Sequence, residues 1–161
     1  MKQTKLYNII LPIWLLVLFP QVWLITVPGN LIIDCAVLLL TLLALKHPQK
    51  KGVLKQLWWK FWLLGFAADA VGVAWMILGL LLGECSPWLQ KHLTYTLHNA
   101  FGSPLSFVWT LISVVLAGVC IYFFDKQAMR SCPLLTDRQK HIIALTMAIV
   151  TAPWLFFIPM Y

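Results

Sequence analysis

The sequence predicts an all-α polytopic membrane protein, a single bundle of five transmembrane helices. The chain of 161 residues is 61% hydrophobic and only 11% charged. A soluble domain is roughly 45–50% apolar and about 25% charged, so this chain could not cover a water-facing surface of its own. Apolar runs near the spanning length of about 20 residues alternate with polar connections. The predicted spans are about 7–27, 29–45, 61–83, 103–124 and 141–159, with an amphipathic external helix at about 86–101.

The first two spans are predicted to meet at a tight turn. Residues 7–27 are long enough to cross a bilayer. Lysines before an apolar run resemble a signal peptide, but no small-residue cleavage site follows, so we expect an uncleaved first helix. Residues 27–30, Val-Pro-Gly-Asn, have the composition of a turn. Residues 31–45 then form a short second span that contains Asp34.

A basic connection at 46–60 leads into the third span, 61–83, which carries an aspartate among small residues. Trp58 and Trp59 beside lysines are typical of the membrane–water boundary. On a helix, residues at i, i+4, i+7, i+11, i+14 and i+18 share one face. That face consists of Gly65, Asp69, Gly72, Met76, Gly79 and Gly83. It is predicted to pack against another helix.

The external connection and the fourth span follow. Ser86 and Pro87 are typical of an N-cap and a first helical position, and the polar and apolar residues after them predict a short helix on the membrane surface. The fourth span carries a seam at spacings of three and four. Small and hydroxyl residues in such a seam let helices approach closely in lipid, so we expect a packing face. The seam consists of Ser103, Ser106, Thr110, Ser113, Ala117 and Cys120.

The last span is predicted from His141 to about Pro159, with Pro153 inside it. Thr136 and Gln139 have the spacing of a capping box and mark the start of a helix. A third stripe of small residues runs along this span. Its members are Ala144, Ala148 and Thr151.

The distribution of basic residues predicts the orientation. If the connections alternate between the two sides, eleven of the twelve Lys and Arg fall on the side of the N-terminus. This asymmetry predicts a cytoplasmic N-terminus and an external C-terminus. It also accounts for the net charge of +7 without nucleic acid. Lys50, Lys51 and Lys55 are primarily a topology signal, with an anionic-lipid site as the alternative.

Four polar residues on four helices are predicted to reach a similar depth. From the cytoplasmic end of each span, Asp69 lies about 13 Å deep, and Asp34, Ser113 and Thr151 about 16 Å deep. An ionised Asp at the centre of a membrane helix costs about 2.5–3.5 kcal/mol on insertion scales. The pair of carboxylates could share a proton or hold a cation, with neutral packing residues or a face for a partner subunit as the alternatives.

Other chemistry is weakly indicated, and no metal or cofactor is predicted. Cys35, Cys85, Cys120 and Cys132 have no close spacing, which argues against a disulfide framework or a redox motif. The external connection holds Glu84, Cys85, His92 and His98, but their spacing matches no standard zinc pattern. Phosphate-binding, dinucleotide, metalloprotease and serine-hydrolase motifs are missing from the sequence.

The opening KLYNIILPIWLLVLFP and the closing LTDRQKHIIALTMAIVTAPWLFFIP resemble a group of small multi-pass bacterial membrane proteins. No function is attached to that group. The resemblance implies the cytoplasmic membrane of a bacterium, and it supplies no catalytic residues.

Three functional hypotheses follow. The first is a non-enzymatic accessory or scaffold subunit that contacts the lipid bilayer and either a membrane-protein partner or further copies of itself. Its motivation is three small-residue seams on a chain that is too small to bury them all. The second is a small proton- or cation-coupled transporter or channel that uses Asp34 and Asp69. The third is an intramembrane enzyme built on the same two carboxylates.

Overall fold

The computed structural model describes residues 20–93, 96 and 99–159, and within them every regular element is helical. This confirms the predicted all-α fold. Four helices are long and apolar enough to cross a membrane, within Thr26–Ala44, Lys50–Glu84, Pro104–Ser131 and Asp137–Phe157. The elements in chain order are α2 (Pro20–Ala44), α3 (Lys50–Gly83), α4 (Pro87–Leu93), α5 (Pro104–Ala128), η2 (Met129–Ser131), α6 (Asp137–Val150) and η3 (Trp154–Phe157).

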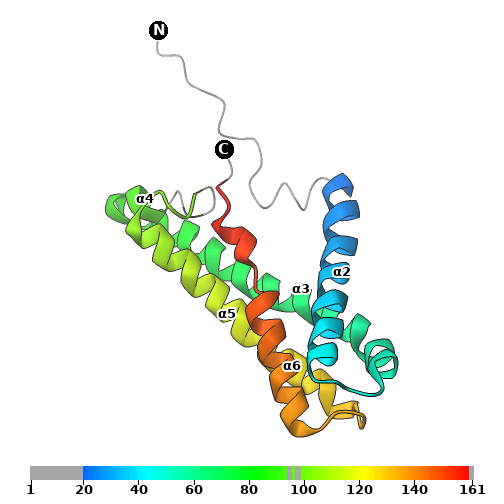
Figure 1. The fold of residues 1–161 in the computed structure, drawn as a ribbon. Coiled ribbons are helices and arrows are strands. Elements are labelled where there is room, and N and C mark those ends of the chain that lie inside the picture. The colour runs from blue at the N-terminus through cyan, green and yellow to red at the C-terminus, as the bar shows by residue number, and fades with distance from the viewer. Residues whose placement is uncertain (1–19, 94–95, 97–98, 160–161) are drawn as a thin grey trace.

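Helices α3 and α5 run side by side along the length of the molecule (Figure 1). Helix α6 packs on α5, and α2 packs on α3 and α6. The N-terminal part of α2 diverges from α5 and η3, whereas the four long helices converge at the other end of the bundle, which we call the closed end (Figure 1).

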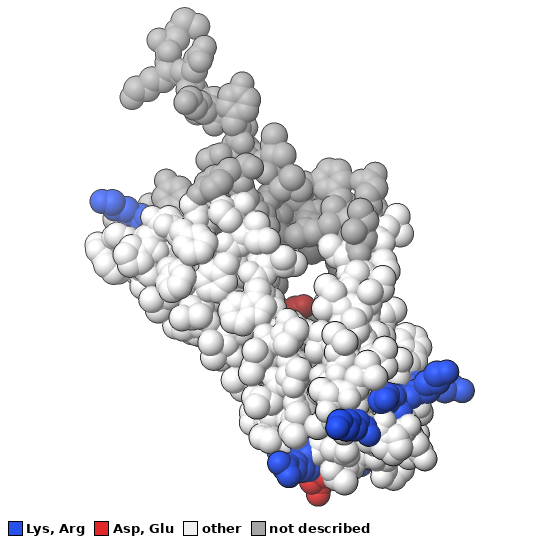
Figure 2. All heavy atoms as spheres, in the orientation of Figure 1, with Lys and Arg blue, Asp and Glu red and all other residues white. Residues whose placement is uncertain are grey.

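The closed end contains the hydrophobic core. Side chains from all four long helices and from the connection between α5 and α6 meet there, and each is almost completely buried. Lys and Arg gather around the same end of the molecule (Figure 2). The core consists of Leu38, Leu42, Val53, Leu57, Phe61, Ala68, Ile121, Met129, Cys132, Leu135, Ile143, Ala144 and Met147.

Helix α2 replaces the tight turn predicted at residues 27–30. It continues from Pro20 to Ala44 with Pro28 inside it. Proline removes one helical hydrogen bond, but membrane helices tolerate this where neighbours supply other partners. At this level Trp62 Nε1 donates a hydrogen bond to the Val27 carbonyl at 3.1 Å, which ties α2 to α3. The predicted first span overlaps α2 at residues 20–27, and its remaining residues, 7–19, lie outside the described part of the chain.

Helix α3 begins at Lys50, which shortens the predicted connection 46–60 to a few residues. Its 34 residues measure about 51 Å at 1.5 Å per residue, longer than a hydrocarbon core of about 30 Å. The basic first turns of α3 therefore continue the helix beyond the length that a span needs, rather than forming a loop. The external helix was predicted at about 86–101. Helix α4 begins at Pro87 as expected, and its bounds are Pro87–Leu93.

The predicted caps are present, and the last span ends early. The Ser103 side chain accepts from the backbone N–H of Ser106, and Thr136 and Gln139 form the capping box. Helix α6 stops at Val150 instead of continuing to about 159, because Pro153 cannot donate to the carbonyl of residue 149. The indole Nε1 of Trp154 donates to that Ile149 carbonyl at 2.9 Å instead.

Candidate functional site

The small-residue faces predicted on the third and fourth spans pack against each other. Ser113 Oγ donates a hydrogen bond to the Gly72 carbonyl at 2.7 Å. A Cβ atom at Gly72 would lie 3.3 Å from the Ala117 Cβ and 3.0 Å from the Phe156 ring, so the α3 backbone approaches its neighbours closely. Two of the three seams are therefore used within the chain.

Further along α3, the space at Gly79 is filled by Trp109 of α5. A Cβ atom at Gly79 would lie 2.4 Å from the indole Nε1 of Trp109. That Nε1 donates to the Trp75 carbonyl at 3.1 Å, and the two indole rings stack with centroids 4.6 Å apart. Gly83, the last residue of α3, is buried as well.

The hydroxyl groups near the N-terminal end of the α5 seam, on Ser106 and Thr110, donate hydrogen bonds to backbone carbonyls. Ser106 Oγ donates to the His92 carbonyl at 2.6 Å and so holds the end of α4 against α5. Thr110 Oγ1 donates to the Ser106 carbonyl within α5 at 2.9 Å. These residues have a structural role in joining and capping helices.

Asp34 projects from α2 towards α3 and is only 4% exposed. The absence of a side chain at Gly65 makes room for it, because a Cβ atom there would lie 3.5 Å from Asp34 Oδ2 and 3.9 Å from Asn30 Nδ2. This Oδ2 atom is buried and has no hydrogen-bond partner among the described residues. Gly65 thus makes room for the carboxylate of Asp34 instead of for the backbone of a neighbouring helix.

Two further carboxylates lie within electrostatic range of Asp34. Asp69 lies on α3 and Asp125 on α5, and a negative charge on either would repel a negative charge on Asp34. Asp69 is half-buried and Asp125 is 2% exposed. Each has one buried oxygen, Oδ1 of Asp69 and Oδ2 of Asp125, without a hydrogen-bond partner in the described part of the chain. We call Asp34, Asp69 and Asp125 the aspartate cluster.

The predicted fourth span ends at residue 124, which places Asp125 in the polar connection after it. The structure continues α5 to Ala128 and places Asp125 on its buried face. The signal was present in the spacing, since Ala117, Ile121 and Asp125 follow one another at intervals of four. Continuing from Ala117 in steps of four, instead of through Cys120, reaches Asp125.

Ser113 and Thr151, which were predicted to accompany the carboxylates, bond elsewhere. Ser113 donates to the Gly72 carbonyl, and Thr151 Oγ1 donates to the Met147 carbonyl at the end of its own helix at 2.9 Å. The predicted four-residue cluster is therefore replaced by three aspartates on three helices, of which Asp34 and Asp69 were predicted.

Basic residues do not neutralise the aspartate cluster in the described part of the chain. The ion pair there joins Lys140 to Asp137 at 3.4 Å, at the start of α6. Among the described residues, no group of three His, Cys, Asp or Glu side chains is placed to hold a metal ion. Figure 2 shows a hollow beside α2 with acidic side-chain atoms at its base.

This arrangement places an oxygen of each of three carboxyl groups away from water and without a basic partner among the described residues. Each buried charge without a partner carries a desolvation cost of several kcal/mol, and the repulsion between neighbouring carboxylates adds to it. A proton neutralises a carboxylate, so each carboxyl group of the aspartate cluster is a group that can bind and release a proton.

Comparisons of the chain with protein-family models, with curated proteins and with solved structures find no match.

Proposed function

We propose that the protein is a small membrane transporter, or the proton-handling part of one, that binds and releases protons at Asp34, Asp69 and Asp125. The observation that carries this proposal is the group of three like-charged side chains on three helices, each with a buried oxygen that has no hydrogen-bond partner among the described residues. Ionisable residues inside a membrane bundle are costly, and they typically mark ion or proton pathways.

A proton fits this group better than a metal ion. The described residues offer no set of three metal ligands, whereas single protons need only one carboxylate oxygen each. The half-buried Asp69 would exchange protons with water that enters the hollow, and Asp34 would connect it to Asp125. The transported solute, if protons drive the movement of one, would enter the same hollow.

We further propose that the basic ends of the four candidate spans face the cytoplasm. Basic residues flank the membrane on the cytoplasmic side, and in this chain they lie where α2 and α5 end and where α3 and α6 begin. Because α6 begins at this basic end and proceeds away from it, the C-terminus would be external, as the sequence predicts. These residues are Lys46, Lys50, Lys51, Lys55, Lys60, Lys126, Arg130, Arg138 and Lys140, with Lys91 at the opposite end.

The side of the N-terminus and the fifth span depend on residues 7–19, which lie outside the described part of the chain. Both stay predictions. The assignment to the cytoplasmic membrane of a bacterium rests on the resemblance alone.

An accessory subunit is the second candidate. Its original support is weaker, because the seams on α3 and α5 pack against each other rather than against a partner. Its remaining support is that the N-terminal part of α2 diverges from α5 and η3 (Figure 1). Native mass spectrometry and cross-linking in membranes would test it, and a stable monomer without a co-purifying partner would count against it.

The intramembrane enzyme stays a third prediction.

Proton flux into liposomes tests the main proposal. The purified full chain is reconstituted with a trapped pH-sensitive dye, and an imposed pH gradient should collapse faster than in protein-free liposomes. Asp34→Asn should abolish the difference because it removes the central carboxylate. Asp137→Asn is the matched control, since Asp137 is fully exposed outside the aspartate cluster. Native protein with no flux above protein-free liposomes would contradict the proposal.

A further inference from the structure

A groove between α3 and α5 opens on the side of the bundle near its basic end. Its volume is about 340 Å³. Ligand pockets commonly measure about 300–1,000 Å³, so this groove is at the lower end of that range. It is lined by Trp59, Lys60, Leu63, Leu64, Phe124, Gln127, Ala128 and Ser131. We infer that the groove binds one anionic phospholipid, with the phosphate at Lys60 and an acyl chain along the apolar wall.

The polarity of the groove changes along its length in the way that a phospholipid requires. On α3 the chain proceeds from Lys60 to Leu64, away from the basic end of the bundle. On α5 it proceeds in the opposite direction, from Phe124 towards Ser131. The cation and hydroxyl therefore lie at the membrane boundary, and the leucines and phenylalanine lie deeper. A headgroup and its acyl chain have the same order across a bilayer.

Lys60 is held in position at the mouth of the groove. Its Nζ donates to Ser131 Oγ at 2.9 Å and lies 5.9 Å from the centre of the Trp59 ring. An ammonium group has three donors, so donors remain for a phosphate oxygen. Among the described residues Lys60 has no carboxylate partner, since the ion pair there is Lys140 with Asp137. The missing counter-charge and the interfacial tryptophan both fit an anionic headgroup.

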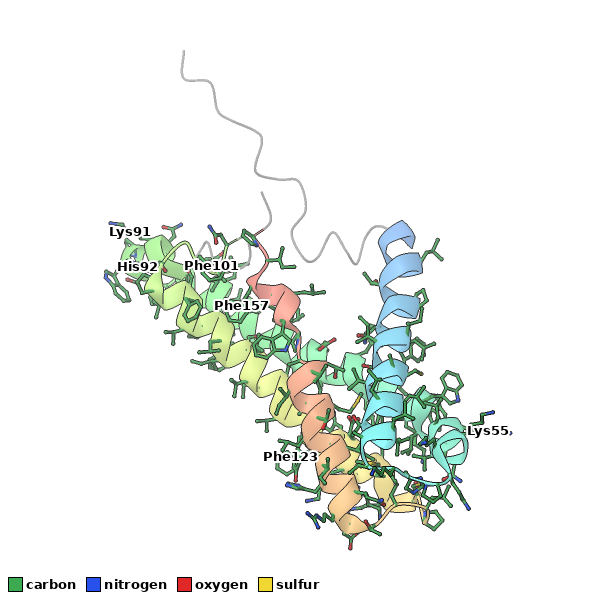
Figure 3. The ribbon with its side chains drawn as sticks, viewed as in Figure 1. Lys55, Lys91, His92, Phe101, Phe123 and Phe157 are labelled. Atoms are coloured by element: carbon green, nitrogen blue, oxygen red, sulfur yellow. The ribbon has the colours of Figure 1, made fainter. Side chains whose placement is uncertain are left out.

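This groove is separate from the basic patch that the sequence indicated. Lys55 points outward from the first turns of α3 (Figure 3). At 3.6 residues per turn it lies about 140° around the helix from Lys60. Lys55 therefore has the same charge and the same helix but does not line the groove, which makes it the matched control.

Native mass spectrometry of the delipidated full chain tests the inference. Dioleoylphosphatidylglycerol and dioleoylphosphatidylcholine are titrated separately, and one tight phosphatidylglycerol adduct is expected. Lys60→Ala should weaken that adduct about fivefold, the effect of one basic residue near an anionic lipid. Lys60→Arg should retain most of the binding, and Lys55→Ala should leave it unchanged.

Three results would overturn the inference. Equal weakening by Lys55→Ala would mean that the basic surface attracts lipid without a defined site. Equal affinity for phosphatidylcholine and phosphatidylglycerol would show that Lys60 does not select an anionic headgroup. Displacement of the lipid by millimolar glycerol 3-phosphate would show that the apolar wall contributes nothing. Retained helical circular dichroism in each variant separates lost binding from lost folding.

Discussion

Ser113 of α5 donates a hydrogen bond to the backbone carbonyl of Gly72 on α3 at 2.7 Å, within the most extensive helix–helix contact among the described residues. The contact is close because Gly72 has no side chain and Ala117 has a small one. In lipid, where hydrophobic burial does not drive helix association, such close contacts and interhelical hydrogen bonds hold helices together. The α3–α5 pair is therefore the structural base on which the aspartate cluster is built.

Ser113→Ala should lower the free energy of unfolding by about 0.6 kcal/mol and by no more than about 1.7 kcal/mol, the range found for interhelical hydrogen bonds in a membrane protein. The measurement is reversible unfolding in mixed micelles. Thr146→Ala is the control, because the Thr146 hydroxyl bonds to the Ile142 carbonyl within its own helix. A larger loss in the control would contradict the role assigned to Ser113.

Gly79→Ala should destabilise the bundle by about 1–3 kcal/mol, the usual cost of overpacking. The added methyl group would lie 2.4 Å from Trp109 Nε1 and would displace the stacked indole pair. Gly65→Ala is the comparison, since its Cβ would be at an ordinary contact distance of 3.5 Å from Asp34 Oδ2. The near-ultraviolet circular dichroism of the tryptophans should change in the first variant and not in the second.

Asp125→Asn should separate stability from function. Asn has a similar size to Asp and cannot ionise, so the buried site no longer has to accommodate a charge and the free energy of unfolding should stay the same or rise. Proton flux in liposomes should fall if the carboxylate carries protons. An unchanged flux together with raised stability would exclude Asp125 from the proton path while leaving Asp34 and Asp69 in it.

His47→Ala should loosen the basic end of the bundle. His47 is 5% exposed, its Nε2 donates to the Leu134 carbonyl at 2.9 Å, and its Nδ1 accepts from the backbone N–H of Gln49 at 3.2 Å. The side chain thus ties the short connection before α3 to the connection before α6. Loss of both bonds should cost about 1–3 kcal/mol and raise amide exchange in residues 46–52. Exchange that remains at the native rate would contradict this role.

Several elements could be predicted from local signals. The start of α4 at Pro87, the Ser103 cap of α5 and the capping box of α6 depend on residues close together in sequence. The packing faces of α3 and α5 followed from helical spacing, because every such residue points to the same side. The ends of spans were harder, since Pro28 lies inside α2 whereas Pro153 follows the end of α6.

The sequence by itself determined that this protein is helical and apolar enough for a membrane, because composition and the length of apolar runs depend on no neighbour. It also identified Asp34 and Asp69 as costly residues that need an explanation. Only the tertiary structure decided their companions. Depth along a helix does not fix rotation about its axis, so a predicted common depth could not show that Ser113 and Thr151 bond to backbone carbonyls. Asp125 came into electrostatic range of Asp34 because α2 and α5 both pack against α3 and α6, an arrangement that no local pattern records.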